Sequence, residues 1–208
     1  MQENQFVIIN RLGEIGRIIE YNRGDSTCWV QIESDDQFEW GPDADEFQIT
    51  DLTELHEAKQ EKAKDNSEKF HAILFKSYSC IGSSRNPTLA ILERKGALQV
   101  TLYSYFDGLN ERILLSQKDS EKLKRICKQA KTYRWLKKCH EQSDYGICDG
   151  TEWQLVVFSG LYWYEISDSN SEPYMLRDLF CYLEELGLPV TWEKGVGPML
   201  IESAETDI

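Results

Sequence analysis

The sequence predicts an α+β protein, in which a small β-barrel-like unit precedes an antiparallel sheet with helices packed on one face. Short apolar runs separated by turn residues fill positions 1–50, whereas residues 70–208 alternate hairpins with amphipathic helices. Residues 51–69 between them are charged and contain few large apolar side chains. We therefore expect two domains, at residues 1–50 and 70–208, joined by a charged helical linker at residues 51–69.

The first fifty residues contain four strand-like runs, each followed by residues that favour turns. Four or five short antiparallel strands within about fifty residues are typical of a small curled barrel of the SH3-like kind. We therefore predict an SH3-like β barrel for residues 1–50. The strand-like runs are Gln5–Asn10, Ile15–Tyr21, Thr27–Glu33 and Glu46–Thr50.

Residues 51–69 predict a solvated helix, because Glu, Lys, Ala and Gln dominate them and Leu52 and Leu55 are their only large apolar residues. After this linker the pattern predicts a strand and two passes of hairpin and helix, both helices having an apolar stripe that can pack on the sheet. Ser116, followed three residues later by Asp119, predicts the N-cap of the first of these helices. The predicted elements are strands at Phe70–Tyr78, Thr88–Glu93, Leu98–Phe106 and Arg112–Leu115, a helix from Lys118 to Gln142, strands at Trp153–Phe158 and Tyr162–Ile166, and a helix from Pro173 to Leu186.

Charge is divided along the chain into three blocks. Residues 1–68 carry 6 basic and 17 acidic side chains, residues 69–142 carry 15 and 6, and residues 143–208 carry 2 and 13. The total of −13 repels nucleic acid and anionic lipid at long range and attracts a basic protein. We therefore expect a basic protein, such as a toxin or effector domain, as the partner, rather than nucleic acid or a membrane.

The six cysteines and the N-terminus bear on the compartment. No Cys-x-x-Cys pair occurs, and no apolar signal segment or membrane-spanning stretch is visible. We therefore expect free thiols and a cytoplasmic location.

The candidate partner-binding site is an acidic cluster with aromatic residues, including Trp29, among its carboxylates. Carboxylates steer a cationic partner, and flat aromatic side chains anchor it. A solvated acidic loop is the alternative, and a calcium loop is the weaker rival because the oxygen spacing and closing Glu of an EF-hand are absent. The predicted contact residues are Glu33, Asp35, Asp36, Phe38, Glu39, Trp40, Asp43, Asp45 and Glu46.

A second candidate is the basic face of the helix predicted from Lys118. Cations at helical spacing can follow a phosphate backbone, and Tyr133 or Trp135 could stack on a base. The negative charge of the flanking blocks opposes this use, so we favour solvation or docking of this face on acidic segments. The residues of the alternative nucleic-acid contact are Lys124, Lys128, Lys131 and Lys138.

No motif in the sequence indicates catalysis, a metal or a cofactor. His56, His71 and His140 stand in no recognisable arrangement with a nucleophile and an acid. Cys139-His140 with Cys148 lacks the paired, closely spaced ligands of structural zinc sites. We therefore predict a protein that is not an enzyme and has no metal or cofactor, although a carboxylate pair formed by folding is invisible in sequence.

The segment 149–187 combines a turn, a strand with Trp153, the aromatic run Tyr162-Trp163-Tyr164, Pro173 and a leucine-rich helix. This pattern resembles one found in small acidic bacterial proteins of the toxin-immunity type. The resemblance implies a bacterial origin and carries over no functional residue.

Together with the acidic cluster, this resemblance leads to the hypothesis of a cytoplasmic immunity-type inhibitor. Such a protein blocks a basic toxin or effector by acidic surface complementarity. The alternative is an adaptor in a nucleic-acid or phage-defence complex that uses the basic helix 118–138.

Overall fold

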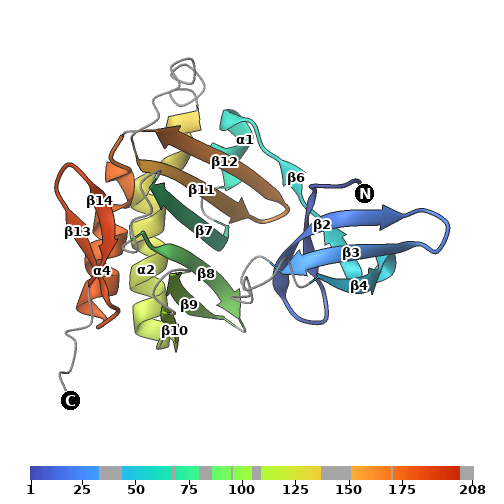
Figure 1. Ribbon diagram of the computed structural model, residues 1–208, viewed down its shortest axis with the longest axis horizontal. Helices are drawn as coiled ribbons and strands as arrows, with labels where there is room; N and C mark the ends of the chain where they lie inside the picture. The colour runs from blue at the N-terminus through green and yellow to red at the C-terminus, as the bar shows by residue number, and fades with distance from the viewer. Residues whose placement is uncertain are drawn as a thin grey trace.

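The computed structural model describes residues 1–32, 44–66, 69–79, 86–94, 96–104, 109–136, 151–169 and 171–201. These residues form a mixed α+β structure dominated by sheets, which confirms the α+β part of the predicted fold class (Figure 1). Figure 1 shows an N-terminal sheet on the right, a larger sheet in the centre, and helices α2 and α4 on the left. No helix in the described part of the chain is long and apolar enough to cross a membrane.

The N-terminal sheet has the strand order β4-β3-β2-β1-β5, with every pairing antiparallel. Val7, Ile18 and Val30 are among the apolar side chains buried inside it. A Cβ at Gly16 would collide with Cγ1 of Val30, so the absence of a side chain at residue 16 leaves room for the Val30 side chain. Over the described residues β4 and β5 are open edges, and the SH3-like barrel is not confirmed. The strands are β1 (Phe6–Ile9), β2 (Glu14–Asn22), β3 (Thr27–Ile32), β4 (Ala44–Gln48) and β5 (Leu52–Glu54), with a 3-10 turn, η1 (Ile49–Asp51), before β5.

The helix predicted over residues 51–69 is wrong for residues 51–59. Here the chain forms β5, which pairs with β1, and a short strand, β6 (His56–Glu57), which pairs with the large sheet. Leu52 and Leu55 are both buried, because the extended backbone directs them into the apolar interior. Helix α1 starts only at Gln60 and ends at Asn66. The boundary expected at residue 50 therefore cuts through the N-terminal sheet.

The large sheet has the order β10-β9-β8-β7-β11-β12-β6 and is antiparallel except between β12 and β6. The strands predicted after residue 70 are confirmed with small shifts of their ends. The β11–β12 hairpin pairs with β7 on the side opposite to β8, so β7 occupies the middle of the sheet. The strands are β7 (Phe70–Ser79), β8 (Thr88–Arg94), β9 (Ala97–Ser104), β10 (Leu109–Leu114), β11 (Thr151–Ser159) and β12 (Tyr162–Ser169).

Helices α2 (Gln117–Ala130) and α4 (Arg177–Glu185) pack on one face of this sheet, as predicted. Ser116 caps α2 by accepting a hydrogen bond from the backbone N–H of Asp119. The helix predicted from Lys118 to Gln142 is not continuous, because Lys131 adopts a left-handed conformation (φ 48°) that ends α2. A 3-10 turn, η2 (Thr132–Trp135), follows, and residues 137–150 lie outside the described part.

The second helix also starts later than predicted. Residues Tyr174–Leu176 form a 3-10 turn, η3, and the α-helix begins at Arg177. A hairpin of β13 (Val190–Glu193) and β14 (Gly197–Leu200) follows α4 and packs against it.

The N-terminal sheet covers the other face of the large sheet. Along β7, Ala72 and Leu74 join Phe6 and Ile15 in one apolar cluster, whereas Ile73 belongs to the cluster beneath the helices. This alternation is the two-residue period of a strand that is buried on both faces. The large sheet is therefore the middle layer of the molecule, with helices on one side and the N-terminal sheet on the other (Figure 1).

Candidate functional site

Most of the predicted acidic contact lies outside the described residues. This applies to Glu33, Asp35, Asp36, Phe38, Glu39, Trp40 and Asp43. The structure does place Asp45 and Glu46, which are exposed on β4, an edge of the N-terminal sheet.

The structure brings Glu46 beside an exposed tryptophan. Trp29 on β3 is 41% exposed, and its register partner on β4 is Glu46. Its register partner on β2 is Glu20, so Trp29 has a glutamate on either side. Residues directly opposite in an antiparallel pair direct their side chains to the same face. Trp29 and the two carboxylates therefore share the outer face of the sheet.

A β-bulge in β2 adds an apolar side chain to this face. The register with β3 shifts between Ile18 and Glu20, so Ile19 is an extra residue, 38% exposed, next to Glu20. We call the four residues Ile19, Glu20, Trp29 and Glu46 the Trp29 surface. Asp45 lies outside it, because its register partner, Val30, points into the interior.

Neither carboxylate of the Trp29 surface has an ion pair or a hydrogen bond with another described side chain. Glu20 and Glu46 are both exposed, and their negative charge is therefore available to a ligand. An aromatic ring attracts a cation over its face, and a neighbouring carboxylate adds a direct charge interaction. The arrangement is suited to a lysine or arginine side chain.

The basic face of α2 is partly neutralised within the protein. Lys124 Nζ donates to Glu93 Oε1 at 2.6 Å, and Lys122 Nζ donates to Glu185 Oε2 at 3.0 Å. Glu185 belongs to the acidic C-terminal block, so its pair agrees with the expectation that acidic segments compensate this helix, whereas Glu93 belongs to the basic central block itself. Lys128 and Lys131 are exposed near its end, and Lys138 lies outside the described residues.

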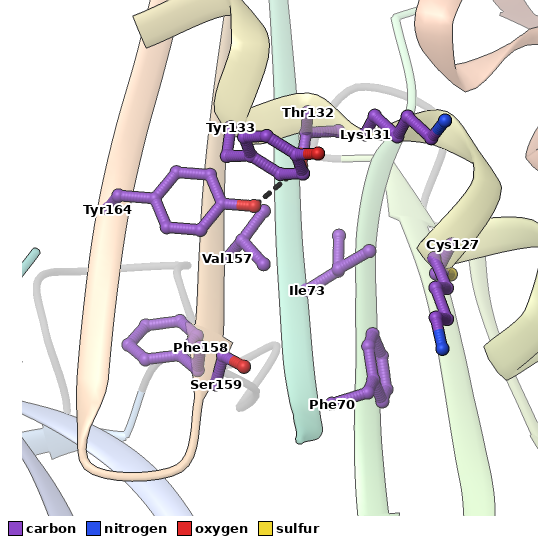
Figure 2. Close-up of a pocket in the computed structure, with 11 residues that line it drawn as sticks. Phe70, Ile73, Cys127, Lys131, Thr132, Tyr133, Val157, Phe158, Ser159 and Tyr164 are labelled. Atoms are coloured by element: carbon purple, nitrogen blue, oxygen red, sulfur yellow. Dashed lines mark hydrogen bonds between the residues drawn. The ribbon is translucent and has the colours of Figure 1, made fainter. Parts of the chain in front are cut away.

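A small cavity lies where α2 ends against β7, β11 and β12 (Figure 2). Its volume is about 20 Å³, enough for one water molecule. On its wall Thr132 Oγ1 and Tyr164 Oη share a buried hydrogen bond of 2.6 Å, the dashed line in Figure 2. Burial raises the pKa of Tyr164 and the pKa of the Cys127 thiol to about 12. Both groups are therefore neutral near pH 7.

The histidines and the metal-ligand candidates do not converge where the structure describes them. Burial lowers the pKa of His71, which keeps this imidazole neutral, although the nearby charge of Glu93 acts in the opposite direction. No group of three or more His, Cys, Asp or Glu side chains within the described ranges could hold a metal ion. Cys139, His140 and Cys148 fall outside those ranges.

Glu20 and Ile19 were not among the site residues expected from the sequence. They are distant in sequence from the acidic cluster, and only the register of β2 with β3 places them beside Trp29. One signal was available in the sequence: Cys28 and Val30 flank Trp29, and the two-residue period of a strand directs Trp29 to the face opposite to theirs. No protein-family model matches the chain, and no curated protein matches it.

Proposed function

We propose that this chain is a binding protein that takes up a basic protein partner on the Trp29 surface, and that it acts as a cytoplasmic immunity-type inhibitor of a basic toxin or effector. The observation that carries the proposal is the exposed indole of Trp29 between Glu20 and Glu46. The N-terminal block around this surface is strongly acidic, and the whole chain has a net charge of −13.

Each component of the Trp29 surface contributes to binding a basic partner. The long-range negative field accelerates encounter with a positively charged protein. An arginine or lysine placed over the ring gains about 0.5–1 kcal/mol at an exposed site and about 2 kcal/mol once water is excluded. Ile19, next to Glu20 on β2, adds exposed apolar area that the partner can cover. Tryptophan is among the residues most often found to dominate the energy of protein interfaces.

Such a surface can inhibit an enzyme without any catalytic group of its own. An enzyme that acts on a polyanion such as nucleic acid presents cations around its active site. A carboxylate-rich protein that pairs with those cations competes directly with the substrate. Inhibition then requires only charge complementarity and a well-anchored contact, and it needs no cofactor.

The experiment that tests this proposal starts with the full chain, affinity-tagged in its native cells, and identifies the captured partner by mass spectrometry. The partner is then purified, and calorimetry measures its affinity for wild type, for Trp29→Ala and for the double variant Glu20→Lys/Glu46→Lys. Glu111→Lys/Glu193→Lys is the matched control, because it makes the same charge change at exposed positions of β10 and β13.

We expect Trp29→Ala to weaken binding by about thirtyfold or more, which corresponds to a loss of about 2 kcal/mol at an interface hot spot. The Glu20→Lys/Glu46→Lys variant should lose more affinity than its control, and the excess should shrink in high salt. Wild type, but neither Trp29-surface variant, should block the partner's own activity at equimolar concentration. An acidic partner, or equal affinity of all variants, would contradict the proposal.

The alternative function, an adaptor that contacts nucleic acid through the basic helix, has one supporting observation. Lys131 and Arg134 are exposed just beyond the end of α2 and have no ion pair within the described residues. A gel-shift titration in low salt tests it, with Lys124, Lys128 and Lys131 replaced by alanine. The alternative predicts a shift whose salt dependence decreases in this variant, and absence of any shift rejects it.

A further inference from the structure

An open groove lies between the end of α2 with η2 on one side and η3 with the start of α4 on the other. Its volume is about 540 Å³, which is in the range of small-molecule sites. The groove is separate from the Trp29 surface and from the cavity of Figure 2, although Lys131 lines both the groove and the cavity.

One part of the groove is aromatic. The rings of Trp135 and Tyr174 meet edge to face, with centroids 4.4 Å apart and an interplanar angle of 76°. Tyr174 is 56% exposed, which leaves much of its ring accessible in the groove. Met175 is buried beside it and supplies apolar lining. A planar ligand can therefore contact an aromatic ring here.

Another part of the groove is cationic. Lys131 and Arg134 line it, both are exposed, and neither has an ion pair within the described ranges. Lys131 has a left-handed backbone, a conformation that glycine adopts more easily. A lysine therefore occupies a position where glycine would stabilise the end of the helix. Asp178 lines the groove as well and adds a hydrogen-bond acceptor to it.

We propose that this groove binds a nucleotide unit. Lys131 and Arg134 bind the phosphate, because charge-assisted hydrogen bonds from these side chains are the strong contacts that phosphates make with proteins. The base stacks on the accessible ring of Tyr174, as bases do on aromatic side chains of nucleic-acid-binding proteins. Asp178 accepts a hydrogen bond from a hydroxyl of the sugar or from an amino group of the base.

The negative charge of the whole protein does not prevent this binding. At physiological ionic strength the Debye length is about 8 Å, so exposed charges farther away act only weakly on a phosphate in the groove. Among the residues that line the groove, the two cations of Lys131 and Arg134 outnumber the one carboxylate, that of Asp178. The local balance of charge is therefore positive.

Calorimetric titration of the full chain in low salt tests the proposal, with adenosine and uridine monophosphates, the corresponding nucleosides and a short single-stranded oligonucleotide as probes. The variants are Lys131→Gly, Arg134→Gln and Tyr174→Ala, and Lys118→Gln at the other end of α2 is the control. Lys131→Gly separates binding from folding, because glycine should maintain or raise the melting temperature while it removes the cation.

We expect Lys131→Gly and Arg134→Gln each to lower the affinity of the protein for phosphate-bearing probes by about tenfold or more. Tyr174→Ala should lower the affinity for nucleosides and for nucleotides by a similar factor. Lys118→Gln should bind all probes with the affinity of wild type. Equal affinity for the monophosphates and the oligonucleotide would identify a free nucleotide as the ligand. Tighter binding of the oligonucleotide, with a stronger dependence on salt, would identify a nucleic-acid strand. The proposal is overturned if no phosphate-bearing probe binds, or if Lys131→Gly and Arg134→Gln bind them like wild type.

Discussion

Glu14 and Arg94 form an ion pair between β2 and β8, and its loss should loosen the N-terminal sheet from the large sheet. Arg94 Nη2 donates to Glu14 Oε1, and Glu14 is only 8% exposed. Arg94 Nε is buried and has no hydrogen-bond partner among the residues that the structure describes. Burial, assisted by the positive charge of Arg112, lowers the pKa of Arg94. The guanidinium thus carries a desolvation cost that the carboxylate of Glu14 offsets.

Replacement of Glu14 by Gln leaves the charge of Arg94 without its counter-ion. Breaking a fully buried pair costs about 3–5 kcal/mol. The Arg94 side chain is 33% exposed, however, and water screens part of its charge. We therefore expect Glu14→Gln to lower the free energy of unfolding by about 1–3 kcal/mol.

Urea unfolding followed by circular dichroism measures this loss. The apolar double variant Glu14→Leu/Arg94→Met is the control, because replacing both partners removes the desolvation cost as well, and it should recover most of the stability. Hydrogen exchange should show faster opening of β1 and β2 in Glu14→Gln, with the strands beneath the helices unaffected. A free energy of unfolding of Glu14→Gln within about 0.3 kcal/mol of wild type would contradict this role of the ion pair, as would a double variant that is less stable than Glu14→Gln.

Three further predictions concern single residues. Gly16→Ala should destabilise the protein by about 1–3 kcal/mol in urea unfolding, because its Cβ would collide with Val30, and an additional Val30→Ala substitution should restore part of the loss. The hydrogen bond that Ser116 donates is the main cause that lowers the pKa of the Asp119 carboxyl group. The ionised carboxylate therefore stabilises the fold at pH values above the usual pKa of aspartate, and this stabilisation is lost as the pH falls through the lower pKa of the folded state. Asp119→Asn should therefore be less stable than wild type at neutral pH, and the difference should disappear in acid; a pH-independent difference would count against it. Burial raises the pKa of the Cys127 thiol to about 12, so this partly exposed cysteine should react with a thiol reagent at mildly alkaline pH much more slowly in the native than in the denatured protein. Equally fast labelling of Cys127 in both states would disprove this.

The sequence predicts which residue types form the candidate site but not how they are arranged in space. Glu46 and Trp29 both belong to the acidic, aromatic region recognised in the sequence. A carboxylate and an aromatic ring each attract a cation, so these residue types alone indicate a basic partner. Their adjacency to Glu20 depends on how β2 and β3 align, including the bulge at Ile19. A shift of one residue in that register would move Glu20 to the other face, and nothing local in the sequence specifies it.

The sequence by itself determined the elements whose signals are local. The strands β8 and β12 follow from apolar runs bounded by turn residues, and the start of α2 follows from the cap at Ser116, since these preferences act within a few residues. Tertiary structure alone decided the rest. Leu52 and Leu55 stand in a segment with helical composition, but burial in two apolar clusters gains more free energy than helix propensity, so this segment is extended. Packing of the N-terminal sheet on Leu74 could not be predicted from the sequence either, because the apolar residues of a strand buried on both faces do not specify which element covers each face.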